Sequence, residues 1–235
     1  MNATETIPDA PSEPWGQARV GDWIQTRSGV KFHLLDPRPK DFVISDIAHA
    51  LANTCRFAGH VSKFYSVAEH SVRVARFVAE RTDYRPKWPE FGATIRPSPR
   101  ILRPGDYVYA ALMHDASESY LGDVPRPIKH LPEFAIYRET EDYLMLCLAV
   151  VFRFENPLPA IVKVADNTLM ATEARDLMWP VTKNWHLKYD LLPGRIRPWS
   201  PRKAKREFLS LFYKINPLGI TKPRSRVWAF FTRAA

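Results

Sequence analysis

The spacing of apolar residues predicts a chain built mainly from helices. Apolar positions recur at three- and four-residue steps, the period that places side chains on one face of a helix. The segments with this pattern are 45–55, 66–81, 106–119, 136–152 and 160–178. In the second segment His70 shares its stripe with Val67, Val74 and Phe77, so its imidazole is expected to face the core.

Both ends of the patterned region carry further elements. Residues 22–26 and 30–34 have the composition of short strands, and Gly29 between them can take the positive φ of a three-residue hairpin turn. Near the other end, Ser200 and Pro201 match the cap and first position of a helix. We therefore expect a mainly α fold with a small N-terminal β-hairpin and a C-terminal helical extension.

Prolines and charge divide the chain into parts. Residues 1–20 are polar with three prolines and are predicted to be a flexible leader, and 84–105 carry five prolines, which indicates an insertion without regular helix. The predicted core is 21–178, including the hairpin and the insertion. Residues 179–235 form a basic, aromatic extension that is expected to pack on this core.

The composition of the chain argues against a membrane-spanning or secreted protein. The chain has 235 residues, 46% of them hydrophobic, which is enough for a continuous core, but no apolar run reaches the roughly 18 residues of a membrane span. The N-terminus lacks a secretory pattern, and the two cysteines, Cys55 and Cys147, are expected to be free buried thiols, so we expect a cytoplasmic protein. The net charge of +9 is not gathered on one helix face, and nucleic acid is not the expected partner.

Several ionisable residues fall on the predicted helices. His114 and Glu118 are four residues apart, Asp115 is adjacent to His114, and Asp166 lies on a later helix. Taken singly, each has a structural interpretation: His70 as a hydrogen-bonded core residue, Asp166 as a buried structural carboxylate, and Glu118 and Glu173 as solvated surface. Their joint placement favours a divalent metal ion, because burying several such groups without one is costly.

Four sequence motifs resemble those of bacterial HD-domain 5′-deoxynucleotidases, in the same order and with similar spacing. They are Ala68-Glu69-His70-Ser71, His114-Asp115-Ala116-Ser117-Glu118, the run 122–129 (GDVPRPIK) and Val162-Lys163-Val164-Ala165-Asp166. The resemblance covers about residues 45–178. It implies a helical HD-domain bundle that holds one divalent ion, Mn, Co, Mg, Fe or Zn, through His70, His114, Asp115 and Asp166.

The resemblance also implies roles for neighbouring residues. Glu118 matches the catalytic carboxylate of that family, and Asp123 matches a second acidic residue near the scissile phosphate. Arg56 is similar to the phosphate-binding arginine, and Phe57 stands where the family has a tryptophan near the sugar. By charge alone, Lys63, His60 and Lys129 are weaker candidates for binding the phosphate of the substrate; the structural interpretation is a solvated surface charge for the two lysines and a loop residue for His60.

The function expected from these motifs is metal-dependent hydrolysis of deoxynucleoside 5′-monophosphates by a protein that, like related enzymes, forms a homodimer. One alternative is a deoxynucleoside triphosphate triphosphohydrolase, because phage HD-domain enzymes of this size are also similar. Another is a non-catalytic nucleotide- or nucleic-acid-binding module that uses the basic tail. A cyclic-dinucleotide phosphodiesterase is disfavoured, since the Gly-Tyr-Pro signature is absent after His114-Asp115.

Overall fold

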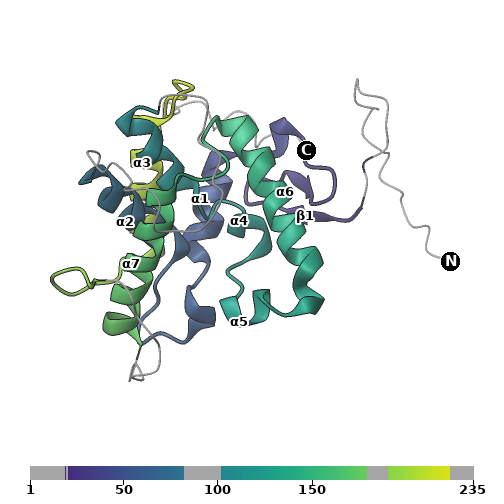
Figure 1. The fold of residues 1–235 in the computed structure, drawn as a ribbon. Helices are drawn as coiled ribbons and strands as arrows, with labels where there is room; N and C mark the ends of the chain where they lie inside the picture. The colour runs from purple at the N-terminus through teal and green to yellow at the C-terminus, as the bar shows by residue number, and fades with distance from the viewer. Residues whose placement is uncertain (1–18, 20, 82–101, 179–189, 223–235) are drawn as a thin grey trace.

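The computed structural model describes Arg19 and residues 21–81, 102–178 and 190–222. This part of the chain is mainly helical with one small antiparallel sheet (Figure 1), which confirms the predicted fold class. Strands β1 (Trp23–Gln25) and β2 (Lys31–His33) pair with Ile24 opposite Phe32, and Gly29 in the turn has φ of 89°. The leader 1–18, residue 20 and residues 84–101 of the insertion lie outside the described residues.

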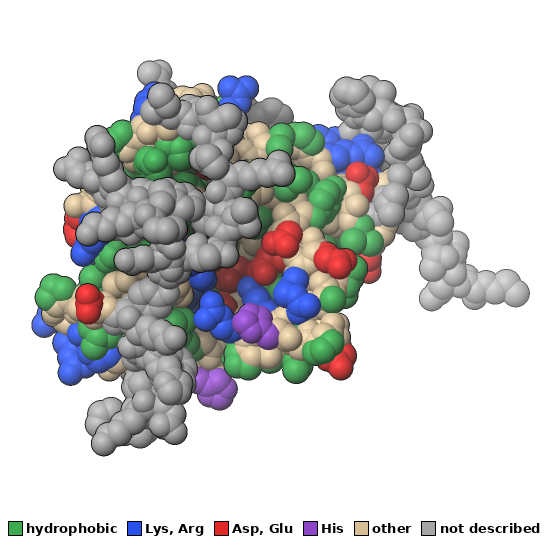
Figure 2. Space-filling model, viewed as in Figure 1, with side chains coloured by type: hydrophobic (Ala, Val, Ile, Leu, Met, Phe, Trp, Pro, Cys, Tyr) green, Lys and Arg blue, Asp and Glu red, His purple; other side chains and the backbone are tan. Residues whose placement is uncertain are grey.

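Helix α2 occupies the centre of the helical arrangement and packs against α1, α3, α7 and α8. The helices are α1 (Ile44–Asn53), α2 (Val67–Ala79), α3 (Pro104–Met113), α4 (Glu118–Leu121), α5 (Arg126–Lys129), α6 (Ala135–Phe152), α7 (Ala160–Leu177) and α8 (Pro201–Ile215). Short 3-10 turns lie at Pro39–Asp41, Phe57–Gly59 and Pro132–Phe134. Acidic and basic side chains gather around a hollow on the face that carries α4 and α5 (Figure 2).

Two predicted helix starts are wrong. Ser45 lies inside the first turn of α1, whose N-cap is Val43. Helix α3 begins at Pro104, and the Asp106 carboxylate accepts the backbone N–H of Arg103 at 2.9 Å from the third helical position. A proline at the first position sacrifices no hydrogen bond, because that N–H has no partner within a helix. The predicted cap at Ser200 is correct, since its hydroxyl accepts from the backbone of Lys203.

The predicted helix 106–119 is also wrong at its end. Helix α3 stops at Met113, and the chain continues through tight turns in which the N–H of Ala116 bonds to the Met113 carbonyl at 3.0 Å. The Ser119 hydroxyl donates to the Ala116 carbonyl at 2.7 Å, a local bond that competes with a regular helix. His114 and Glu118 therefore do not share one helix face, and Asp115 sits in the turn between α3 and α4.

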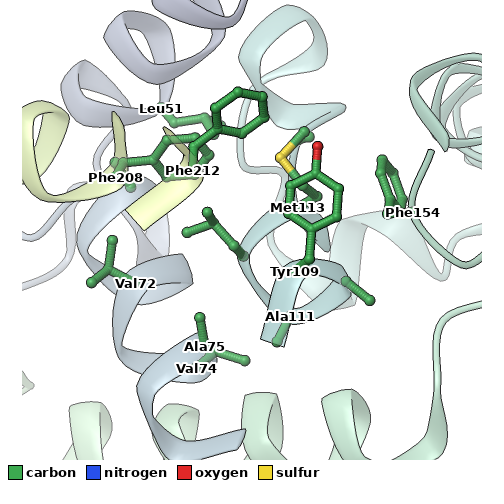
Figure 3. Close-up of a cluster of buried hydrophobic side chains, with 14 of the residues drawn as sticks. Leu51, Val72, Val74, Ala75, Tyr109, Ala111, Met113, Phe154, Phe208 and Phe212 are labelled. Carbon is green, nitrogen blue, oxygen red and sulfur yellow. The ribbon is translucent and has the colours of Figure 1, made fainter. Parts of the chain in front are cut away.

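The core joins residues that are distant in sequence (Figure 3). Leu51 on α1, Tyr109 on α3 and Phe208 and Phe212 on α8 are all at most 1% exposed. The Phe212 ring lies 5.8 Å from that of Tyr109, and the Tyr109 hydroxyl donates to the Phe152 carbonyl at 3.0 Å. Helix α8 is thus part of the same hydrophobic core as α1, α2 and α3.

None of the described helices combines the length and the apolar character needed to cross a membrane. The two cysteines, Cys55 and Cys147, are free thiols, as predicted, although both are half-buried and not completely enclosed.

A buried carboxylate on α2 ties the chain before α8 to the core. The Glu69 side chain is fully buried and accepts from Arg73 Nε at 2.9 Å and from the Trp199 backbone N–H at 2.6 Å. Three cations, those of Arg73, Arg76 and Lys203, lie 4.9–5.3 Å from the centre of the Trp199 ring. Because Glu69 precedes His70 in α2, this attachment supports the helix that carries a predicted metal ligand.

Replacing Trp199 with alanine is expected to lower the free energy of unfolding by about 2–3 kcal/mol, through lost apolar burial and lost cation–π contacts. Urea denaturation measures this change. Trp23→Ala is the matched control, because Trp23 is 41% exposed at the hairpin edge and contacts one cation, Lys31. Equal effects of the two substitutions would contradict this account of the attachment.

Candidate metal centre

Three helices bring four predicted metal ligands to one place. His70 comes from the first turns of α2, His114 and Asp115 follow the end of α3, and Asp166 lies on α7. The imidazole rings are 5.2 Å apart, and His114 Nε2 lies 3.2 Å from Asp115 Oδ2. One ligand atom from each of His70, His114 and Asp115 lies within 4.8 Å of the others, a group that could hold a metal ion.

Asp166 approaches this group from one side. Its Oδ1 lies 3.3 Å from His70 Nε2, and its Oδ2 accepts from Lys163 Nζ at 2.9 Å. It does not belong to the group whose ligand atoms are all mutually within 4.8 Å. The side chain is 22% exposed, so its carboxylate faces both the histidines and solvent.

The hydrogen bonds of the two imidazoles leave the same nitrogen available on each ring. His114 Nδ1 lies 2.8 Å from the Ala111 carbonyl, which can only accept, so Nδ1 carries the proton. His70 Nδ1 lies 2.6 Å from Glu173 Oε1, a carboxylate that fixes the same tautomer. Both Nε2 atoms are buried without a hydrogen-bond partner among the described residues. Two unpartnered buried nitrogens beside a carboxylate fit a cation site.

Glu173 is a functional candidate that sequence reasoning missed. The sequence pattern indicates solvated helix surface at this position, yet the side chain is fully buried. Its carboxylate receives the Tyr65 hydroxyl at 2.9 Å and Arg56 Nε at 3.2 Å, in addition to His70 Nδ1. The spacing could have revealed it, because Glu173 follows Asp166 by seven residues, two turns along α7 on the same face.

Arg56 reaches the centre from the segment between α1 and α2. Its side chain is buried, with Nη1 3.5 Å from Asp115 Oδ2 and the guanidinium 5.5 Å from the Phe57 ring. The backbone N–H of Arg56 bonds to the Tyr65 carbonyl at 2.9 Å, and this closes the loop between them. Phe57 and Ala58 have φ of 56° and 51°, a strained conformation for residues with a Cβ. Strain of this kind recurs beside functional sites.

Lys63 and His60 are not brought to the centre. Both side chains are exposed on the loop before α2, and no ion pair or hydrogen bond joins either to the other described site residues. The predictions for these two residues therefore receive no support from the geometry. Lys129 differs, because its Nζ lies 3.6 Å from Glu118 Oε1 and 2.6 Å from Glu141 Oε1.

Glu118 and Asp123 lie on the side of the centre formed by α4 and α5. Glu118 is buried, again unlike the solvated interpretation, and its Oε2 has no hydrogen-bond partner among the described residues. Burial and the charges of Asp115 and Asp123 raise the pKa of Glu118 well above its usual range. Burial also raises the pKa of Asp123, although the Arg56 guanidinium opposes this. These two carboxyl groups therefore stay protonated to a higher pH than ordinary carboxyl groups on a protein surface.

The imidazole of His70 and the carboxylates of the centre stabilise each other's charged forms. Burial and Arg56 lower the pKa of His70, but Glu173 and Asp166 outweigh them and raise it to about 9. Burial raises the pKa of Asp115, but His114, His70 and Arg56 together bring it well below its ordinary value. His70 next to three carboxylates thus holds a cationic form that a divalent ion could replace.

The fold and the site define a helical protein with a candidate histidine–aspartate metal centre. No family model matches the chain. The uncharacterized protein YfdR of Escherichia coli strain K12 is 36% identical over 211 residues, which cover 83% of this chain and 97% of YfdR. The chain belongs to the same family as YfdR. An uncharacterized protein of Rhodobacter capsulatus is 35% identical over 155 residues, 65% of this chain and 69% of that protein.

Replacing Glu173 with glutamine is expected to lower the affinity for Mn²⁺ about 10- to 100-fold, because the amide cannot fix the His70 tautomer as the carboxylate does. Isothermal titration calorimetry on metal-free protein measures this change. Glu133→Gln, an exposed glutamate outside the site, is the matched control and should bind as the wild type does. Unchanged affinity in a folded Glu173→Gln protein would contradict the positioning role.

Proposed function

We propose that this chain is a metal-dependent phosphohydrolase of the HD-domain type that cleaves deoxynucleoside 5′-monophosphates. The observation that carries the proposal is the pair of buried Nε2 atoms on His70 and His114, which have no partner among the described residues and lie beside Asp115. The order of the four motifs supports the choice of reaction class. The proposed activity comes from that resemblance together with the chemistry of the surrounding side chains.

His70, His114 and Asp115 would hold the ion, with Asp166 as the fourth ligand. Two imidazoles and two carboxylates form a mixed nitrogen and oxygen set that suits Mn²⁺, Co²⁺, Fe²⁺ or Zn²⁺ better than Mg²⁺. A bound divalent ion would supply a Lewis acid that withdraws charge from a phosphoryl oxygen. Glu173 keeps the His70 ring in the orientation and tautomer that this role requires.

Arg56 has the position and the chemistry to bind the phosphate. Glu173 engages its Nε, while Nη2 has no hydrogen-bond partner among the described residues. Nη1 lies 3.5 Å from Asp115 Oδ2, so the guanidinium is held at two nitrogens and presents Nη2 in a fixed plane, the geometry that suits phosphate oxygens. The Phe57 ring beside it offers an apolar contact for the sugar, as its place in the motif implies.

Glu118 and Asp123 would manage the protons of the reaction. In the hydrolysis a water oxygen forms a bond to phosphorus while the bond from phosphorus to O5′ breaks, giving a deoxynucleoside and phosphate. The attacking water loses a proton and O5′ gains one, so one carboxyl group must accept and one must donate. Glu118 has a free Oε2 for this purpose, and Lys129 holds its other oxygen in place.

The test is an assay of a panel of nucleoside mono-, di- and triphosphates in the presence of Mn²⁺, Co²⁺ or Mg²⁺. We expect the protein to release phosphate from the deoxynucleoside monophosphates. Asp115→Asn should abolish turnover, because one proposed metal ligand is lost. Lys63→Gln is the control and should leave the rate unchanged, since Lys63 does not approach the centre. Inactivity on every monophosphate, or full activity of Asp115→Asn, would refute the proposal.

Kinetics on the same nucleotides also distinguish the proposed roles of Arg56 and Glu118. Arg56→Lys should raise KM for the monophosphate more than it lowers kcat, because it removes planar phosphate binding. Glu118→Gln should instead lower kcat by about 100-fold, the scale of lost proton transfer. Release of triphosphate or pyrophosphate from the nucleoside triphosphates would instead indicate that this site has triphosphohydrolase activity.

A further inference from the structure

Two side chains near the start of α6 hold the segment that joins α4 to α6 (Figure 1). The Tyr137 hydroxyl donates to the Gly122 carbonyl at 3.1 Å, directly before Asp123 in the chain. The Glu141 carboxylate accepts from Nζ of Lys129, the last residue of α5, at 2.6 Å. Helix α6 therefore fixes the segment that carries Asp123 and Lys129 beside the metal centre.

The Lys129 ammonium lies between two carboxyl groups and is much closer to one of them. Its Nζ makes a charge-assisted hydrogen bond to Glu141 Oε1 at 2.6 Å. It lies 3.6 Å from Glu118 Oε1, which is an ion pair beyond hydrogen-bond distance. The ammonium also lies 5.6 Å from the centre of the Tyr137 ring, a cation–π contact on the Glu141 side. The stronger partner of Lys129 is therefore Glu141, which the proposed reaction does not use.

The distance between Lys129 and Glu118 matters because Glu118 is surrounded by charges of both signs. It faces the carboxylates of Asp115 and Asp123 and the cations of Arg56 and Lys129. Burial and the two carboxylates raise the pKa of Glu118, whereas Arg56 and Lys129 oppose this rise. A direct hydrogen bond from Lys129 would stabilise only the ionised form of Glu118. The position of the ammonium therefore influences how readily Glu118 gains a proton.

We propose that Glu141 is a positioning residue that holds Lys129 away from Glu118 and so keeps Glu118 able to gain and lose a proton. Pairing with Glu141 neutralises the ammonium, which then gains less from approaching Glu118. The Glu118 carboxyl group keeps its Oε2 free of partners among the described residues. The catalytic consequence rests on the proposed function, whereas the placement of Lys129 does not, and the two tests below separate them.

The first test is the crystal structure of the full chain with Glu141→Gln. We expect Lys129 Nζ to move within about 2.7–3.0 Å of Glu118 Oε1, because the amide carries no negative charge. Glu141→Asp keeps the charge and should leave Lys129 away from Glu118. Glu139→Gln is the matched control, since Glu139 is exposed on the same helix. An ammonium that stays in its wild-type position in Glu141→Gln would overturn the proposal, whether or not the protein is active.

The second test is the pH dependence of kcat on a deoxynucleoside monophosphate with Mn²⁺. The limb of the profile that disappears in Glu118→Gln is the one that Glu118 controls. In Glu141→Gln this limb should move to lower pH, because the closer ammonium stabilises the Glu118 carboxylate. KM should change by less than about twofold, since Arg56 still binds the phosphate. A loss of kcat without movement of the limb would indicate a structural role only, against the proposal.

Lys129→Met determines whether Glu141 acts through Lys129. Adding Glu141→Gln to Lys129→Met should leave the pH profile unchanged, because the cation on which Glu141 acts is already absent. A further shift in the double variant would contradict the proposal, provided that thermal melting shows each variant to be folded. A wild-type protein that is inactive on every monophosphate would refute the proposed hydrolysis, and the crystal structures would still decide what positions Lys129.

Discussion

The buried carboxylate of Glu173 is the group on which the rest of the site depends. It lies at the centre of a network in which Tyr65, Arg56 and His70 all donate to it, and it comes from a different helix or loop than each of them. A carboxylate buried without partners would cost several kcal/mol, so these three groups must be assembled together. Their assembly fixes both the ring of His70 and the guanidinium of Arg56.

The hydrogen bonds to Glu173 connect the packing of the helices to the availability of the two histidines for a metal ion. Because the Glu173 network fixes Nδ1 of His70, and the Ala111 carbonyl fixes Nδ1 of His114, each Nε2 is directed into the buried space beside Asp115. A divalent ion bound there would displace the second proton that His70 carries in its cationic form. Packing of α2 against α3 and α7 then sets the distance between the two Nε2 atoms. The attachment of Trp199 to Glu69, one residue before His70, extends the same support to the segment before α8.

The sequence predicted the parts of this arrangement that periodic patterns determine. The helical stripe through Val67 and Phe77 placed His70 in the core, and the motif around His114 and Asp115 identified residues that do lie together. Glu173 was missed because a single carboxylate in a polar-looking helix gives no sign of burial; only its spacing from Asp166 does. The end of α3 was misjudged because the tight turns at 114–117 depend on local bonds such as that of Ser119, which leave apolar spacing unchanged.

A divalent cation bound between the two imidazoles and Asp115 would be visible by X-ray diffraction from crystals grown with Co²⁺, with data collected at the cobalt absorption edge. We expect one anomalous peak within about 2.0–2.3 Å of Nε2 of both His70 and His114. A well-diffracting crystal with no peak there, or with cobalt bound only elsewhere, would contradict it.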